Sequence, residues 1–100
     1  MGKLERDFQS KLIKELKQIF DGCIIMKNDP DYIQGIPDLL ILFEDKWAAL
    51  EAKKSANAPH RPNQDYYVNR MDTMSYASFI YPENKEEVLY ELQQALFSRR

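Results

Sequence analysis

The segment PDLLILFEDKWAALEAK, residues 37–53, carries the clearest fold signal in this chain of 100 residues. Its first half, Leu39–Phe43, is a continuous apolar run, which is typical of a strand covered on both faces. The polar residues 44–46 indicate a turn, and a second apolar segment starts at Trp47. We therefore predict a β-hairpin made of two buried strands.

Charged side chains lie where the two strands of this hairpin meet the polar chain. Asp38 precedes the first strand, whereas Glu51 and Lys53 end the second. Residues i and i+2 of a strand point to the same face, so Glu51 and Lys53 project together and Ala52 points away. Because the hairpin brings Asp38 beside them, we expect two carboxylates and one ammonium group to converge at one edge of the sheet.

This set of side chains suits the hydrolysis of a phosphodiester. Mg²⁺ and Mn²⁺ prefer oxygen ligands, and Mg²⁺ commonly binds one or two protein carboxylates together with several waters. A metal ion held by Asp38 and Glu51 would polarise the phosphodiester and lower the pKa of a bound water. Lys53 would orient that water or stabilise charge on the phosphate oxygens. A surface hairpin with a simple Glu–Lys pair is the alternative, but the combined pattern favours a catalytic site.

Glu5 is a further candidate metal ligand. Apolar residues recur with helical spacing from Leu4 to Phe20, and Glu5 falls on the apolar side of that helix. An inward-facing carboxylate needs a partner or a metal ion, so Glu5 could support the metal directly or through water. The alternative is an ordinary acid in the first helical turn, where the helix dipole favours negative charge.

The remaining segments complete an α/β domain. We predict a strand at Cys23–Lys27, a helix from Pro62 to about Met74, a strand at Ala77–Tyr81 and a last helix after Glu83. The order α-β-β-β-α-β-α predicts one domain, residues 1–100, with a mixed four-stranded sheet flanked by helices. The first three strands can form a meander, and the helical crossover permits parallel pairing of the fourth.

Polar and basic residues follow the Glu51–Lys53 segment. Gln64 lies on the inward face at the start of a predicted helix, where it could position the attacking water or a phosphate oxygen, or cap the local backbone. The net charge of −2 argues mildly against a nucleic-acid partner, but residues 53–70 carry four basic side chains and one acidic one. A solvated basic loop is the alternative. We expect this segment to contact DNA phosphates through Lys54, Ser55, His60 and Arg61.

These residues resemble the PD-(D/E)xK nuclease superfamily, and especially the small standalone members of its VRR-NUC group that are found in phages. The resemblance runs along nearly the whole chain, through Glu5, Gly35-Ile36-Pro37-Asp38, Glu51-Ala52-Lys53 and Gln64. It implies a restriction-endonuclease-like αβββαβ core and Mg²⁺- or Mn²⁺-dependent hydrolysis of DNA. It also implies a homodimer and, as in some standalone members, cleavage of Holliday junctions.

We therefore expect a metal-dependent DNA endonuclease of recombination, repair or phage DNA processing. Its catalytic residues would be Asp38, Glu51, Lys53 and Gln64, with the metal at Asp38, Glu51 and Glu5. A nucleic-acid-binding protein that keeps the fold without catalysis is the second hypothesis, and a small interaction module is the third.

The composition places limits on compartment and assembly. Cys23 is the only cysteine, which excludes an internal disulfide, and no apolar run or signal peptide indicates a membrane or secreted protein. We expect a cytoplasmic protein of a bacterium or a phage-infected host. Trp47, Phe97 and several tyrosines exceed what a small core must bury, and aromatic residues are enriched at interfaces, which favours a homodimer.

Overall fold

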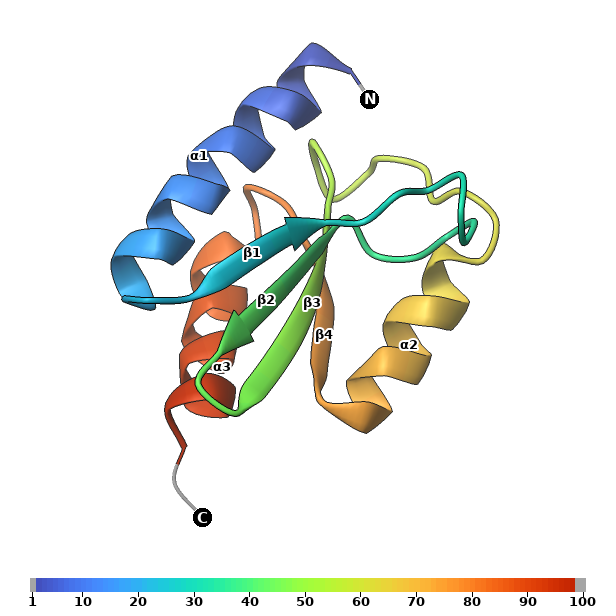
Figure 1. Cartoon of the computed structure of the whole chain (residues 1–100). Helices are drawn as coiled ribbons and strands as arrows, with labels where there is room; N and C mark the ends of the chain where they lie inside the picture. The colour runs from blue at the N-terminus through green and yellow to red at the C-terminus, as the bar shows by residue number, and fades with distance from the viewer. Residues whose placement is uncertain (1, 99–100) are drawn as a thin grey trace.

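Three helices and four strands form the domain in a computed structural model that describes residues 2–98. Their order confirms the predicted α-β-β-β-α-β-α sequence of elements (Figure 1). Along the chain the elements are α1 (Lys3–Ile19), β1 (Ile24–Lys27), β2 (Leu39–Phe43), β3 (Lys46–Ala52), α2 (Gln64–Met74), β4 (Tyr76–Ile80) and α3 (Lys85–Phe97).

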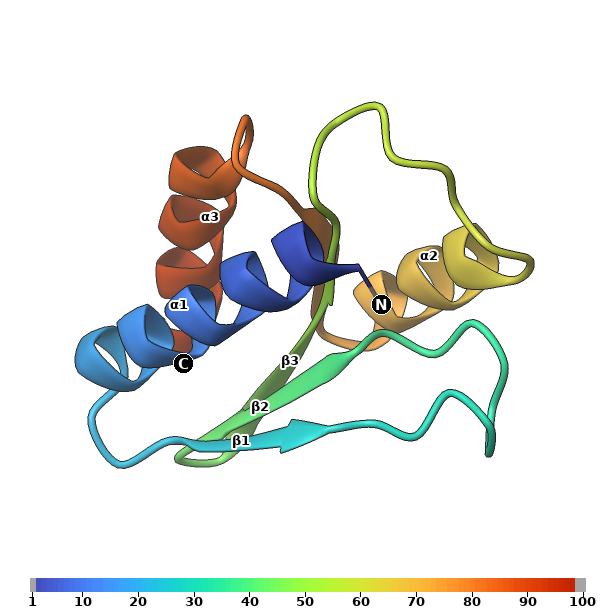
Figure 2. The same cartoon turned by 90° about the horizontal axis from the view of Figure 1, so that it is seen from above.

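The four strands form one mixed sheet in the order β1-β2-β3-β4. The first three strands pair antiparallel as a meander, and β4 pairs parallel to β3 after the crossover through α2. Helices α1 and α3 lie on one side of the sheet and α2 on the other, as seen from above in Figure 2. This confirms the α/β class and the mixed sheet.

The hairpin of β2 and β3 has the predicted strands but a shorter turn. Leu39 lies opposite Leu50, and Phe43 lies opposite Lys46, so Lys46 belongs to the strand rather than to the turn. Only Glu44 and Asp45 connect the strands, and Glu44 adopts a φ of 56°. Two-residue hairpin turns favour positive φ because their twist matches that of the strands.

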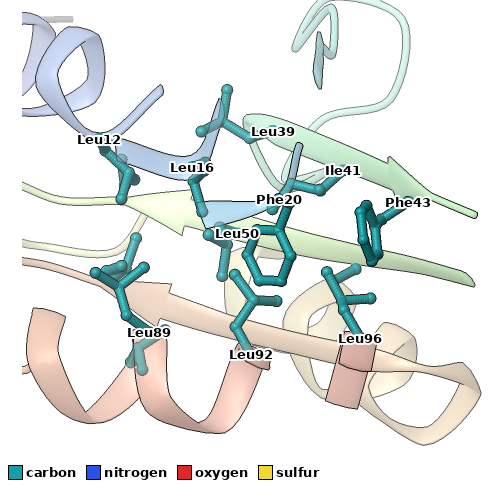
Figure 3. Packing of buried hydrophobic residues seen from close by; sticks show 14 residues of the cluster. Leu12, Leu16, Phe20, Leu39, Ile41, Phe43, Leu50, Leu89, Leu92 and Leu96 are labelled. Atoms are coloured by element: carbon teal, nitrogen blue, oxygen red, sulfur yellow. The ribbon is translucent and has the colours of Figure 1, made fainter. Parts of the chain in front are cut away.

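The main core lies between the sheet and the two helices α1 and α3. Leu12 and Leu16 of α1, and Phe20 directly after it, cluster with Leu89, Leu92 and Leu96 of α3 (Figure 3). Strand β2 is buried at Leu39, Ile41 and Phe43 but only half-buried at Leu40 and Leu42. The expectation that β2 is covered on both faces was therefore wrong, because α2 packs over β3 and β4.

The smaller core on the other side of the sheet fixes the position of α2. Val68 packs on Ala49 of β3 and Ala77 of β4, with Trp47, Met71 and Phe79 around them. Helix α2 begins at Gln64 and not at Pro62, because Asn63 has a left-handed backbone with a φ of 70°. No helix within residues 2–98 is both long and apolar enough to cross a membrane.

Candidate active site

The hairpin brings Asp38 and Glu51 together at one end of the sheet. Leu39 lies opposite Leu50 in the antiparallel pair. Asp38, which precedes Leu39, is therefore a neighbour of Glu51, which follows Leu50. The backbone N–H of Asp38 donates to Oε1 of Glu51 at 3.2 Å. The predicted proximity of these two acids is therefore present in the structure.

The alternation of β3 places Glu51 and Lys53 on one side and Ala52 on the other. Ala52 is fully buried in the main core under α1 and α3, whereas Glu51 and Lys53 line a pocket on the α2 side. The N–H of Lys53 donates to the carbonyl of Ile80 at 2.9 Å, which continues the pairing with β4 beyond the end of β3. The backbone therefore holds Lys53 in the strand direction even though it lies outside the regular strand.

Gln64 connects Glu51 to Lys53 through hydrogen bonds of its side-chain amide. Its Nε2 donates to Oε2 of Glu51 at 3.1 Å, and its Oε1 accepts from Nζ of Lys53 at 2.7 Å. The same Oε1 accepts from the backbone N–H of Arg61 at 2.9 Å. Nζ of Lys53 also donates to the carbonyl of Pro59 at 3.2 Å and lies 4.0 Å from Oε2 of Glu51. Because Glu51, Lys53 and Gln64 are all buried, these bonds fix each side chain in place.

The two carboxyl groups lie in an environment that disfavours negative charge. Burial, followed by repulsion from Asp38, raises the pKa of Glu51 to about 8, while the charge of Lys53 opposes this rise. Burial also raises the pKa of Asp38, with a contribution from the charge of Glu5. Moreover, Oδ2 of Asp38 is buried without a hydrogen-bond partner in the described part of the chain. A buried polar oxygen without a partner is costly, and a proton or a bound cation would reduce that cost.

The donor set fits a magnesium-type ion with a partly hydrated shell. Within residues 2–98, no three side chains of His, Cys, Asp or Glu lie close enough together to hold a metal ion by themselves. Asp38 and Glu51 are two carboxylates, which is the number that Mg²⁺ commonly takes from a protein while it keeps several waters. Glu5 lines the same pocket and acts electrostatically on Asp38. This arrangement favours an indirect contribution of Glu5 through water over direct ligation.

A pocket of about 620 Å³ opens over these groups. It is framed by the start of α1, the loop before β2, the end of β3 and the loop that leads into α2. Of the nine residues that the sequence singles out, eight line it: Glu5, Asp38, Glu51, Lys53, Lys54, His60, Arg61 and Gln64. Lys54 and Arg61 are exposed, so they form a basic rim beside the buried Glu51 and the half-buried Asp38.

Ser55 is the candidate that the structure does not place in this pocket. It is half-buried, and its carbonyl accepts from the N–H of Ala58 at 3.2 Å in a local turn. The structure instead adds Asp31 and Gln34, from the loop before β2, to the pocket lining. No spacing signal in the sequence links that loop to the pocket. In the same loop, Oδ1 of Asp29 accepts from the N–H of Asp31 at 2.8 Å.

Comparison of the chain with protein-family models, with curated proteins and with solved structures gave no match. The function is therefore inferred from the chemistry of the pocket residues. These residues offer a buried and a half-buried carboxylate, a fixed ammonium group and an exposed basic rim.

Proposed function

We propose that this protein is a metal-dependent DNA endonuclease that hydrolyses phosphodiester bonds. The observation that carries the proposal is the buried, unpartnered Oδ2 of Asp38 beside Glu51, in a pocket that also holds Lys53. Two desolvated acids that repel one another are costly unless protons or a cation neutralise them. A basic rim next to such a cation site suits a phosphodiester substrate.

Asp38 and Glu51 would hold Mg²⁺ or Mn²⁺. When bound, such an ion supplies a Lewis acid that polarises the phosphodiester and lowers the pKa of water. The chain contributes the orientation of the ligands, because Glu51 is fixed by the N–H of Asp38 and by Nε2 of Gln64. Oriented ligands of this kind need no rearrangement when the substrate arrives.

Lys53 would act on the phosphate or on the attacking water. An ammonium group has three N–H donors, and two of those of Lys53 are used by Gln64 and Pro59. The third remains for a ligand in the pocket that Lys53 lines. A fixed donor in a buried site stabilises developing negative charge better than a solvated one.

Gln64 would position the other two groups. Its carbonyl oxygen already accepts two hydrogen bonds, and its amide donates to Glu51. The structure thus favours the role of holding Lys53 and Glu51 in register over direct contact with the substrate. The contact with the N–H of Arg61 also supports the capping role that the sequence left open.

The substrate would be DNA, contacted on its phosphates by Lys54 and Arg61 of the exposed rim. The order of elements agrees with the restriction-endonuclease-like core that the resemblance to VRR-NUC nucleases implies, and we include that fold in the proposal. As in the standalone members of that group, we propose a homodimer that acts on branched DNA such as four-way junctions. A twofold dimer offers two sites for paired cuts in the two strands.

Cleavage of a panel of linear, flapped and four-way DNA substrates, with Mg²⁺ or with EDTA, tests this function. We expect cleavage only with the metal ion, and the fastest cleavage for the four-way junction. Binding of these substrates without cleavage under any metal condition would favour the second hypothesis, a nucleic-acid-binding protein that lacks catalysis. Equal cleavage of all substrates would support the nuclease activity and contradict the proposed preference for branched DNA.

A further inference from the structure

His60 is held at the pocket by two separate contacts. Its ring stacks on that of Phe79, with centroids 4.1 Å apart and planes 17° from parallel. Its Nδ1 lies 2.8 Å from Oδ1 of Asp65 in the first turn of α2. A loop residue with two such contacts from β4 and α2 has a defined ring orientation.

The stacking places His60 close to the proposed metal ligands. Phe79 is the register partner of Glu51 on the neighbouring strand β4, so the two side chains lie side by side on the α2 face of the sheet. His60 covers Phe79 and lines the same pocket as Glu51. The carbonyl of the preceding residue, Pro59, accepts from Nζ of Lys53.

The contact with Asp65 determines which ring nitrogen is available. An ionised carboxylate only accepts hydrogen bonds, so Nδ1 carries the proton of this contact. Nε2 makes no hydrogen bond to the described part of the chain, and the His60 side chain is 36% exposed. In the imidazolium form, Nε2 therefore has an N–H that it can give to a ligand in the pocket.

Building on the proposed nuclease function, we propose that His60 is the general acid of the reaction and that Asp65 is its positioning residue. An attacking water gives one proton to solvent as its oxygen forms the new bond to phosphorus, and the bond from phosphorus to the leaving sugar oxygen breaks. The electron pair of that bond stays on the leaving oxygen, which takes the Nε2 proton and departs as an alcohol. His60 is left as the neutral imidazole with its Nδ1 proton still on the Asp65 contact, and solvent restores the Nε2 proton.

The other charged groups of the pocket are less suited to this step. Lys53 is tied to Gln64 and Pro59, and Glu51 is turned toward Gln64 and the backbone of Asp38. Arg61 is exposed, and guanidinium stays protonated in proteins, so it contacts phosphate without giving up a proton. His60 is the only histidine of the chain, and histidine is the side chain that most often serves as a general acid.

Three DNA substrates with one defined cleavage site test this assignment, using the full chain with Mg²⁺. One has natural phosphodiesters, and two carry sulfur in place of the bridging 3′ or the bridging 5′ oxygen, which covers both strand polarities. A thiolate is a much weaker base than an alkoxide, so it leaves without a general acid. His60→Phe keeps an aromatic ring on Phe79 and removes both nitrogens.

We expect His60→Phe to lower the rate on the natural substrate by ~10²-fold or more, and to reach nearly the parental rate on one of the two sulfur substrates. Asp65→Asn should show the same pattern with a smaller loss. Asp7→Asn, which removes an exposed acid on α1 outside the pocket, should match the parent on all three substrates.

Loss of rate by the same factor on all three substrates would overturn the assignment, since a residue that binds phosphate or supports the fold is insensitive to the leaving atom. An unchanged rate on the natural substrate would overturn it as well. Thermal unfolding of His60→Phe checks that the variant is folded, and His60→Gln serves as a second variant without the acid. If the parent protein itself cleaves none of the substrates with Mg²⁺, the nuclease function fails, and the role of His60 fails with it.

Discussion

Gly35 lies directly against Asn63, and both residues have left-handed backbones, with φ angles of 92° and 70°. A Cβ atom on Gly35 would lie 2.7 Å from both the carbonyl carbon and Cβ of Asn63. This contact joins the loop that ends at Asp38 to the loop that starts α2 at Gln64. The close approach therefore sets the distance between Asp38 and Gln64. Asp38 is one proposed metal ligand, and Gln64 orients the other one, Glu51.

Gly35→Ala should disturb the site more than the fold. Any Cβ at a left-handed position costs about 1–2 kcal/mol, and Gly35→Ala adds a collision with the Asn63 backbone. Gly22→Ala is the matched control, because Gly22 has a φ of 86° and nothing within 4 Å of a new Cβ. Urea unfolding should show both variants to be destabilised, and Gly35→Ala more so. Only Gly35→Ala should lose nuclease activity. Equal activity of the two variants would show that the contact between Gly35 and Asn63 does not position the site.

The raised pKa values predict how stability depends on pH without metal. Glu51 keeps its proton up to about pH 8 in the folded protein, against an ordinary value of 4.5 in an unfolded chain. The folded state then binds more protons between these values, so the free energy of unfolding should fall as pH rises from about 5 to about 8. The raised pKa of Asp38 acts in the same direction.

Chemical unfolding in EDTA at several pH values measures this slope. Glu51→Gln should flatten it, since the amide does not titrate, and Mg²⁺ should flatten it in the parent because a cation favours both ionised carboxylates. Glu15→Gln on α1, which removes an acid that is bonded to Lys85, is the control and should leave the slope unchanged. A parent protein that becomes more stable as pH rises over this range would show that the acids are not desolvated as described.

Lys53 and its neighbour Lys54 should differ in their effects. Lys53 is buried and bonded to Gln64, whereas Lys54 is exposed on the rim. Lys53→Ala should lower turnover by ~10²-fold or more, with little change in DNA affinity. Lys54→Ala should weaken DNA binding and reduce its salt dependence while turnover on bound DNA stays close to that of the parent. Single-turnover rates and binding isotherms separate the two, and the reverse pattern would make Lys53 a phosphate anchor.

The edge strand β1 is where we expect the second protomer. Ile24 and Met26 are 59% and 47% exposed on this strand, beside the half-buried Leu42 and Leu40. An apolar edge strand can pair with its own copy about a twofold axis. Light scattering at micromolar concentration should give roughly twice the monomer mass for the parent, and the monomer mass for Ile24→Lys. Leu4→Lys, at a site on α1 that is 70% exposed, should remain dimeric. A monomer mass for the parent protein would contradict the predicted homodimer.

The sequence was most informative where neighbours in space are also near in the chain. The hairpin joins Asp38 to Glu51 across a two-residue turn, and the strand period alone sets Glu51 and Lys53 on one side. Helical spacing likewise predicted the inward face of Gln64. These features follow from local periodicity and need no knowledge of tertiary packing.

Contacts between distant loops could not be predicted in this way. Three features depend on how loops pack in three dimensions. They are the close contact of Gly35 with Asn63, the stacking of His60 on Phe79 and the position of Ser55 outside the pocket. The start of α2 was misplaced for the same reason, since Asn63 takes its left-handed backbone where it meets Gly35. Propensity favours Pro62 at a helix start, but the tertiary contact prevails.

Nicking of a supercoiled plasmid by the parent and by Asp38→Asn, each with Mg²⁺ or with EDTA, tests the metal site most directly. Asn keeps the size of Asp38 but removes one of the two charges that would hold the ion. We predict nicking by the parent only with Mg²⁺, and a loss of at least ~10²-fold in Asp38→Asn, which should remain folded because a repulsion is relieved. Nicking by the parent in EDTA, or parental activity in folded Asp38→Asn, would contradict the proposed site.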